Sequence, residues 1–267
     1  MTEPVRPAIN LTLQPDGVAA PAQRAALVCK EIVDLYFDAL SKADLSMPPP
    51  EASKAFYRFR IGGYEMNTDQ RRAVHENWLL ARCFQDLMRG VLISLREAHL
   101  FIELLSTEHI QVKADTTLDN VLEPFRTRAR SMKFPDLLAS VNKRLDEPLI
   151  FADAYQSMQD ARNCLEHADG QVGNRDVDDD GVLKLRFPRM KLFVMKDGEE
   201  VEIHQNFYVE TETEIGFRLD VRERTFRLGE RLTISAIDFD DIAFACHQFG
   251  TMLAQRLPKG RTPVSPQ

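Results

Sequence analysis

The spacing of hydrophobic residues along the chain predicts a mainly helical protein. The strongest signal runs from Thr68 to about Leu105, where apolar residues recur at steps of three and four positions. Further apolar residues widen this stripe well beyond one face, as expected for the central helix of a bundle. No proline interrupts the stretch, and its one weak point is Gly90, which costs about 1 kcal/mol relative to alanine in a helix.

Prolines mark the expected limits of the shorter helices, since proline suits the first turn of a helix and disrupts its interior. One helix is predicted from Pro21 to about Asp44. Residues 1–20 carry three prolines and Gly17, so we expect them to be extended or disordered, with one short strand around residues 9–13.

Between the long helix and residue 170 the sequence predicts three more helices. A capping-box-like pair, Thr116 and Asp119, starts the first, which Pro124 is expected to kink or restart. Pro135 and Pro148 open the other two. Together these segments predict a helical bundle over residues 21–170.

After residue 181 the hydrophobic period changes from helical to alternating. Leu183, Leu185 and Phe187 alternate with charged residues, and an Asp-Gly pair at 197–198 predicts a hairpin turn. We therefore expect a small antiparallel sheet of three to five strands over residues 182–235. Arginines and carboxylates interleave along its later strands, which is typical of an exposed sheet face.

The last apolar-periodic segment predicts a helix over residues 236–257 that packs back onto the bundle, with Asp238 and Asp241 as its caps. A flexible tail, residues 258–267, should follow. The resulting fold class is mainly α (α+β): a helical bundle with a small antiparallel sheet near the C-terminus.

Composition narrows the function classes. A net charge of −7 argues against a protein that coats nucleic acid, although it allows a local basic cleft. The four cysteines are widely spaced without a C-x-x-C pair, which favours reduced thiols in a cytoplasmic protein. No stretch approaches the roughly 18 apolar residues that a membrane span needs.

Polar residues of distinct chemistry gather near the end of the helix that Pro148 opens and that Gly170 is placed to end. At about 100° per residue, Arg162, Asn163 and His167 fall on the side opposite the apolar stripe, within about 140° of arc. This face therefore combines the guanidinium of Arg162, which can bind a phosphate, with the imidazole of His167, which can transfer a proton near neutral pH.

The pattern Arg162-Asn163-x-x-x-His167, on a late helix of a bundle, resembles the active-site motif of the HEPN superfamily of RNA-cutting and nucleotide-binding domains. The resemblance implies a metal-independent endoribonuclease, active as a homodimer with two motifs facing one RNA groove. It assigns acid–base chemistry to His167, phosphate binding to Arg162, and orientation of His167 or the phosphate to Asn163. It also implies no metal and no cofactor, and a role in prokaryotic stress or defence beside an antitoxin or complex partner.

A second interpretation stays open: a non-catalytic interaction or scaffold protein, in which the motif only stabilises a helix end. Glu166 stands four residues after Arg162 and could hold it in an ion pair. Likewise Arg126, Arg130 and Lys133 recur at helical spacing, either as an RNA-contacting ridge or as a solvated face.

The other sequence motifs give weaker indications of function. The run from Asp176 to Gly181 matches the first half of a calcium loop, but Phe187 stands where the bidentate glutamate belongs, which favours a flexible acidic turn. The chain has no P-loop, no glycine-rich dinucleotide fingerprint and no Gly-x-Ser-x-Gly elbow, which removes several enzyme classes.

Overall fold

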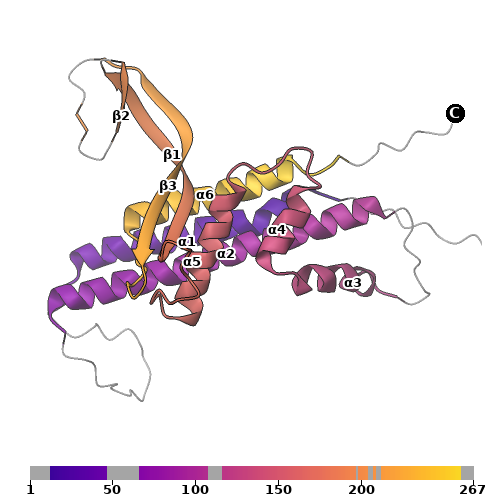
Figure 1. Cartoon of the computed structure of the whole chain (residues 1–267), viewed down its shortest axis with the longest axis horizontal. Helices are drawn as coiled ribbons and strands as arrows, with labels where there is room; N and C mark the ends of the chain where they lie inside the picture. Colours follow the sequence, from indigo (N-terminus) through magenta and orange to yellow (C-terminus); the bar gives the residue numbers. More distant parts are fainter. Residues whose placement is uncertain are drawn as a thin grey trace, which may run out of the picture.

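The structure, a computed structural model, describes residues 13–46, 66–107, 116–196, 198–203, 207–208 and 212–259. This part of the chain is mainly helical with a small antiparallel sheet (Figure 1). Its helices and strands, in chain order, are α1 (Asp16–Lys42), α2 (Thr68–Ser106), α3 (Leu118–Ser131), α4 (Phe134–Asn142), α5 (Ala152–His167), β1 (Val182–Lys196), β2 (Glu199–Glu202), β3 (Ile215–Arg227) and α6 (Ala236–Gln255).

The long helix α2 is the centre of the bundle, as its wide apolar stripe predicts. It begins at a capping box in which the Asn67 side chain accepts from the Gln70 amide and the Gln70 side chain accepts from the Asn67 amide. Helices α1 and α6 pack along it, and Leu87, Val91 and Leu95 are fully buried. The prediction that the last helix packs back onto the bundle is confirmed.

Helix α1 begins at Asp16, earlier than the prediction from Pro21, so the expectation of no helix before residue 21 was wrong for residues 16–20. Val18 and Ala19 are buried in the core, and this packing outweighs the local preference of the prolines. Pro21 lies inside the helix, and the next amide, that of Ala22, donates to the buried Ser94 hydroxyl of α2 at 3.1 Å. The strand expected around residues 9–13 falls almost entirely outside the described residues.

Two glycines allow α1 to approach its neighbours closely. A Cβ atom on Gly90 of α2 would lie 2.6 Å from the Cβ of Ala25 and 2.9 Å from the carbonyl oxygen of Pro21. One on Gly250 of α6 would lie 2.8 Å from the carbonyl oxygen of Ala19. Glycine lowers helix propensity, but its lack of a Cβ atom permits backbone contact between the three helices.

The limits of the middle helices differ from the predictions in detail. The cap of α3 is Thr117, whose hydroxyl accepts from the Asn120 amide at 3.3 Å, and Pro124 lies inside α3 without ending it. Helix α5 begins at Ala152 instead of near Pro148, because Phe151 before it adopts a left-handed conformation (φ 63°). Helix α4 starts as expected, with Pro135 in its first turn.

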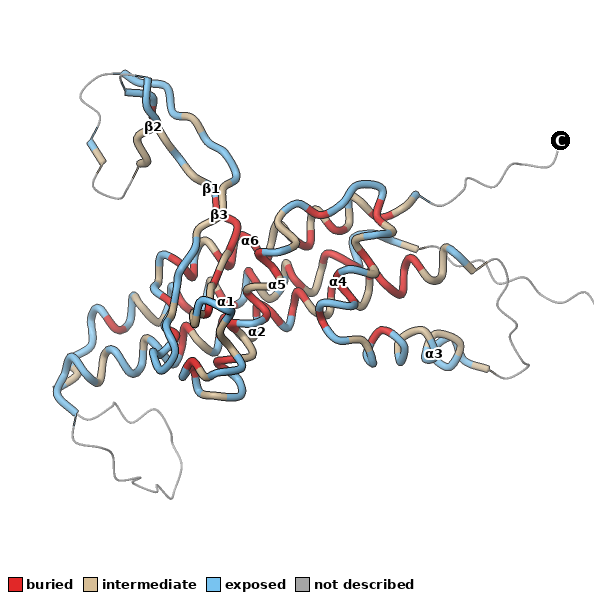
Figure 2. The backbone as a smooth tube through the Cα atoms, in the orientation of Figure 1, coloured by how far each residue is buried: buried red, intermediate tan, exposed pale blue. Residues whose placement is uncertain are grey.

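The sheet has the strand order β2-β1-β3 with antiparallel pairing throughout, and we call it the arm. At its base Leu183, Leu185 and Phe187 are buried in the core between α5 and α6. Beyond Arg189 the arm rises away from the bundle and is largely exposed (Figure 2). Gly198, with φ +84°, lies in the β1–β2 turn; Asp197 is outside the described residues.

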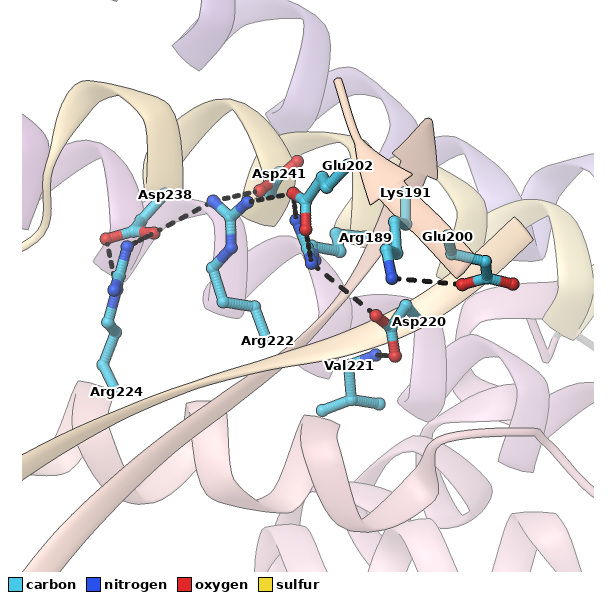
Figure 3. A network of polar contacts seen from close by, with 10 residues as sticks. All are labelled: Arg189, Lys191, Glu200, Glu202, Asp220, Val221, Arg222, Arg224, Asp238 and Asp241. Carbon is cyan, nitrogen blue, oxygen red and sulfur yellow. Dashed lines mark hydrogen bonds and ion pairs between the residues drawn. The ribbon is translucent and has the colours of Figure 1, made fainter. Parts of the chain in front are cut away.

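An ion-pair network joins the arm to the start of α6 (Figure 3). Arg224 donates two hydrogen bonds to Asp238, at 2.8 and 3.0 Å, and Arg222 lies 2.8 Å from Asp241. Arg189 donates to both carboxylate oxygens of Glu202. Arg222 and Arg224 thus tie the sheet to the bundle. The predicted exposed mixed face is otherwise observed, because Arg218, Arg224, Arg227 and Arg231 are exposed and only Arg222 is half-buried.

The cap of α6 is also corrected. Ser235 is the N-cap and accepts from the Asp238 amide at 3.1 Å, while Asp238 and Asp241 hold arginines instead of capping the helix. Of the predicted tail, residues 260–267 lie outside the described residues. Among the helices described, none combines the length and apolar character needed to cross a membrane.

Candidate functional site

Helix α5 carries the predicted motif and is fixed from both sides. Tyr155 and Met158 bury one face in the core, and the Tyr155 hydroxyl donates to the carbonyl of Ala245 in α6 at 3.0 Å. On the other side Ser157 accepts from the Arg186 amide at 2.8 Å and donates to the Lys184 carbonyl, which ties α5 to β1. The polar face of α5 and the first residues of β1 therefore stand side by side in a fixed arrangement.

The three motif residues lie together at the C-terminal end of α5. The Asn163 side-chain oxygen accepts from Gln159 at 2.8 Å and from Arg162 at 3.4 Å. Arg162 forms an ion pair with Glu166, and the Nε2 atom of His167 lies 3.8 Å from the same carboxylate. The helix ends as predicted, because Gly170, with φ +79°, donates its amide to the Cys164 carbonyl at 3.2 Å.

An open groove of about 700 Å³ runs between α5, the 175–178 turn and the start of β1, and we call it the α5–β1 groove. Asn163 and His167 line it, while Arg162 does not. The His167 side chain is 61% exposed, so water and ligands reach its imidazole. The remaining lining residues are Asp153, Gln156, Ser157, Asp160, Arg175, Asp176, Val177, Asp178, Val182, Leu183, Lys184 and Arg186.

The groove is lined by both acidic and basic side chains. Two of the acidic ones, Asp176 and Asp178 in the 175–178 turn, already have hydrogen-bond partners. Asp178 accepts from Lys184 at 2.6 Å and from two backbone amides, and these hydrogen bonds lower the pKa of its carboxyl. Asp176 accepts from the Gly173 amide at 2.9 Å. Burial raises the pKa of the Asp160 carboxyl above its ordinary value.

Two basic side chains, Arg175 and Arg186, line the same groove as Asn163 and His167. Arg186 lies 3.6 Å from Glu223 and is half exposed, and Arg175 has no ion pair within the described ranges. Both can meet an anion that enters the groove, whereas Lys184 is already engaged with Asp178 and Asp180.

The second predicted set, Arg126, Arg130 and Lys133, is not part of this groove. Arg126 pairs with Asp119 and Arg130 with Glu123, each at 3.0 Å, and Lys133 is exposed just before α4. Helix α3 packs on α2, away from the groove (Figure 1). The structure brings the motif together but keeps the ridge apart from it.

The acidic turn differs from a calcium loop because its carboxylates already bind Lys184 and backbone amides. Across the described ranges, no cluster of His, Cys, Asp or Glu side chains could hold a metal ion.

Sequence reasoning missed the other wall of the groove. Leu183 and Leu185 alternate into the core, which places Lys184 and Arg186 on the opposite side of β1. This alternation was the available signal, but only the folded chain shows that α5 lies next to that side.

Comparison with protein-family models, curated proteins and solved structures found no match to this chain.

Proposed function

We propose that this chain is a HEPN-like protein that binds RNA in the α5–β1 groove and cleaves it without a metal. The observation that carries the proposal is the placement of Asn163 and His167, one helical turn apart, on the wall of one open groove. Arg162 contacts Asn163, and Arg175 and Arg186 line the same groove. RNA is the substrate class that the resemblance implies, and its 2′-hydroxyl can serve as the nucleophile when an imidazole takes its proton.

The chemistry follows from these side chains. His167 takes the proton of the ribose 2′-hydroxyl or gives one to the leaving 5′-oxygen, since the imidazole ring carries nitrogens that can accept and donate a proton. Arg162 stabilises the charge that grows on the phosphate, for which it must exchange the Glu166 carboxylate for phosphate oxygens. Asn163, already held by Gln159, orients the phosphate or the imidazole.

The resemblance extends the proposal to the biological setting. It places the protein in a prokaryotic stress or defence system, as a homodimer that works beside an antitoxin or complex partner. The ridge of Arg126, Arg130 and Lys133 is at most a secondary RNA contact, because two of its three cations already have carboxylate partners.

The test is cleavage of mixed RNA by the purified protein, with and without chelator, beside His167→Ala. We expect chelator-resistant cleavage that falls by about 100-fold or more in the variant. His75→Ala, an exposed histidine of α2 outside the groove, is the matched control and should cleave normally. Equal cleavage by His167→Ala, or cleavage that chelator abolishes, would refute the mechanism.

A second candidate function rests on the Arg162–Glu166 ion pair. If the motif only stabilises the end of α5, the protein is a non-catalytic interaction or scaffold protein. In that case Arg162→Ala lowers the melting temperature by several degrees and RNA affinity does not change. A residue that serves a ligand instead costs little stability when it is replaced.

A further inference from the structure

The outer edge of β3 is unpaired along the whole strand. Strand β1 is its neighbour on one side, and none of the described strands pairs with the other side. A 13-residue free edge presents a row of unpaired backbone donors and acceptors, which is a template for another strand. Natural sheets normally shorten or cover such an edge.

One face of the arm is also apolar, and its middle part, around Met190 and Leu192, is exposed in the described structure. Residues opposite each other in antiparallel strands share a face, and the register pairs Met190 with Leu219 and Leu192 with Phe217. These four side chains are exposed, Phe217 to 71%. The opposite face carries the arginines and carboxylates of Figure 3. A partner must therefore satisfy a strand edge and an apolar face together.

We infer that the occupant is a second copy of this chain, with β3 paired antiparallel to its own copy about a two-fold axis at Leu219. The pairing joins the two arms into one sheet and continues the apolar face across it. In this register Arg218, which also pairs with Glu200 of its own chain, stands opposite Asp220 of the copy, twice by symmetry. The strand is thus complementary to itself in charge.

Neighbouring registers lack this complementarity. An axis moved by one residue toward the start of β3 sets Arg218 against Arg218 of the copy, and one moved the other way sets Asp220 against Asp220. Like charges directly opposite each other destabilise a strand pair. An axis midway between two residues would set apolar side chains opposite charged ones, because the side-chain period of a strand is two. An axis at Leu219 avoids both the like-charge pairs and the pairing of apolar with charged side chains.

This dimer separates the two α5–β1 grooves. Lys184, on the groove wall, pairs with Thr225, six residues from the axis, so the two copies of this site lie about 40 Å apart along the strands. Each groove then acts on its own RNA segment, unlike the shared groove that the HEPN resemblance implies. The interface itself does not depend on RNA cleavage.

The first test compares Leu219→Lys with Met190→Lys. The two residues have nearly equal exposure, 43% and 42%, and face each other across β1 and β3, but only Leu219 lies at the edge. By sedimentation or light scattering we expect the full chain at twice its 30.5 kDa mass, and Leu219→Lys to weaken the dimer by at least about tenfold. Met190→Lys should stay dimeric. Monomeric wild type, or equal loss in both variants, would overturn the edge-to-edge arrangement.

Cysteine trapping fixes the register. All four native cysteines are buried, so an introduced surface thiol reacts selectively. Leu219→Cys should give a disulfide-linked dimer under mild oxidation, because the axis brings the two thiols together. Phe217→Cys should not, since its two copies lie about 13 Å apart. Cross-linking of Phe217→Cys, or failure of Leu219→Cys in a dimeric protein, would refute this register.

RNA cleavage separates this inference from the proposed function. Monomeric Leu219→Lys should keep its cleavage rate, whereas His167→Ala should lose cleavage and remain dimeric. Loss of cleavage in the monomer would overturn the separate-groove arrangement while leaving the RNA chemistry of the motif intact.

Discussion

The bundle and the arm use hydrophobic residues in opposite ways. In the bundle, Leu87 and Phe249 are enclosed on all sides by helices. In the arm, Leu192 and Phe217 share one face of a sheet that nothing in the described part of the chain covers. Burial therefore holds the bundle and the base of the arm together, while the rest of the arm depends on a charged face that is tied to α6.

The comparison separates apolar residues that stabilise the fold from apolar residues that are available to bind a partner. Burial stabilises a fold in proportion to the apolar area removed from water, so it is concentrated in the bundle. Exposed apolar area contributes nothing to the isolated chain and becomes favourable only in a complex. Residues of the same type should thus respond very differently to substitution in the two regions.

The largest effect is expected for Phe249→Ala in the bundle. Phe249 is fully buried, with its ring centroid 4.6 Å from that of Tyr155, and its removal leaves a cavity. We expect a loss of about 3–5 kcal/mol in the free energy of unfolding, measured by urea denaturation. Phe217→Ala on the arm is the control and should change this value by less than about 0.5 kcal/mol at monomer concentrations. Similar losses of unfolding free energy in Phe249→Ala and Phe217→Ala would contradict the distinction between bundle and arm.

A smaller effect is expected at the contact between arm and bundle. Asp238→Asn keeps the side-chain size but removes the charge that Arg222 and Arg224 share, and should cost about 2 kcal/mol at neutral pH. Asp240→Asn, an exposed site on the same helix, should cost less than about 0.5 kcal/mol. Urea denaturation of both variants measures the difference.

The same network predicts a pH dependence. Burial by itself would raise the pKa of Asp238, but hydrogen bonds from Arg224 and Ser235 lower it below the ordinary aspartate value. Its stabilisation is therefore complete above the unfolded-state pKa and is lost as the pH falls through the lower, folded-state pKa. The stability advantage of wild type over Asp238→Asn should shrink on acidification; an advantage that grew would contradict the assignment. Comparison with this variant isolates Asp238 from Asp241, whose pKa burial shifts upward.

The smallest effect is expected where bundle and arm form the groove. Glu166→Gln removes the carboxylate that holds Arg162 and lies near His167, at a cost of less than about 0.5 kcal/mol because the pair is partly exposed. RNA affinity, measured by fluorescence anisotropy, should rise about three- to tenfold, since Arg162 is released and a negative charge is lost. Unchanged affinity would mean that Arg162 is not available to RNA.

The sequence predicted best what is local and repetitive. The limits of α2 agree with the prediction to within one residue because its apolar stripe is long and uninterrupted. The grouping of Arg162, Asn163 and His167 was also predictable, since all three lie on one helix at fixed spacing.

What the sequence did not predict depends on tertiary contacts. Prolines suggested that α1 begins at Pro21, but the packing of Val18 and Ala19 extends it to Asp16. The left-handed backbone at Phe151, which delays the start of α5, has no local signature in a non-glycine residue. Lys184, on the groove wall, comes from a strand whose position beside α5 is not encoded in local spacing.

The glycine contacts of α1 restrict how the molecule can move. At Gly90 and Gly250 the backbone of α1 lies directly against those of α2 and α6, and these two contacts oppose sliding or rotation of α1 past its neighbours. The three helices must therefore shift as one rigid block.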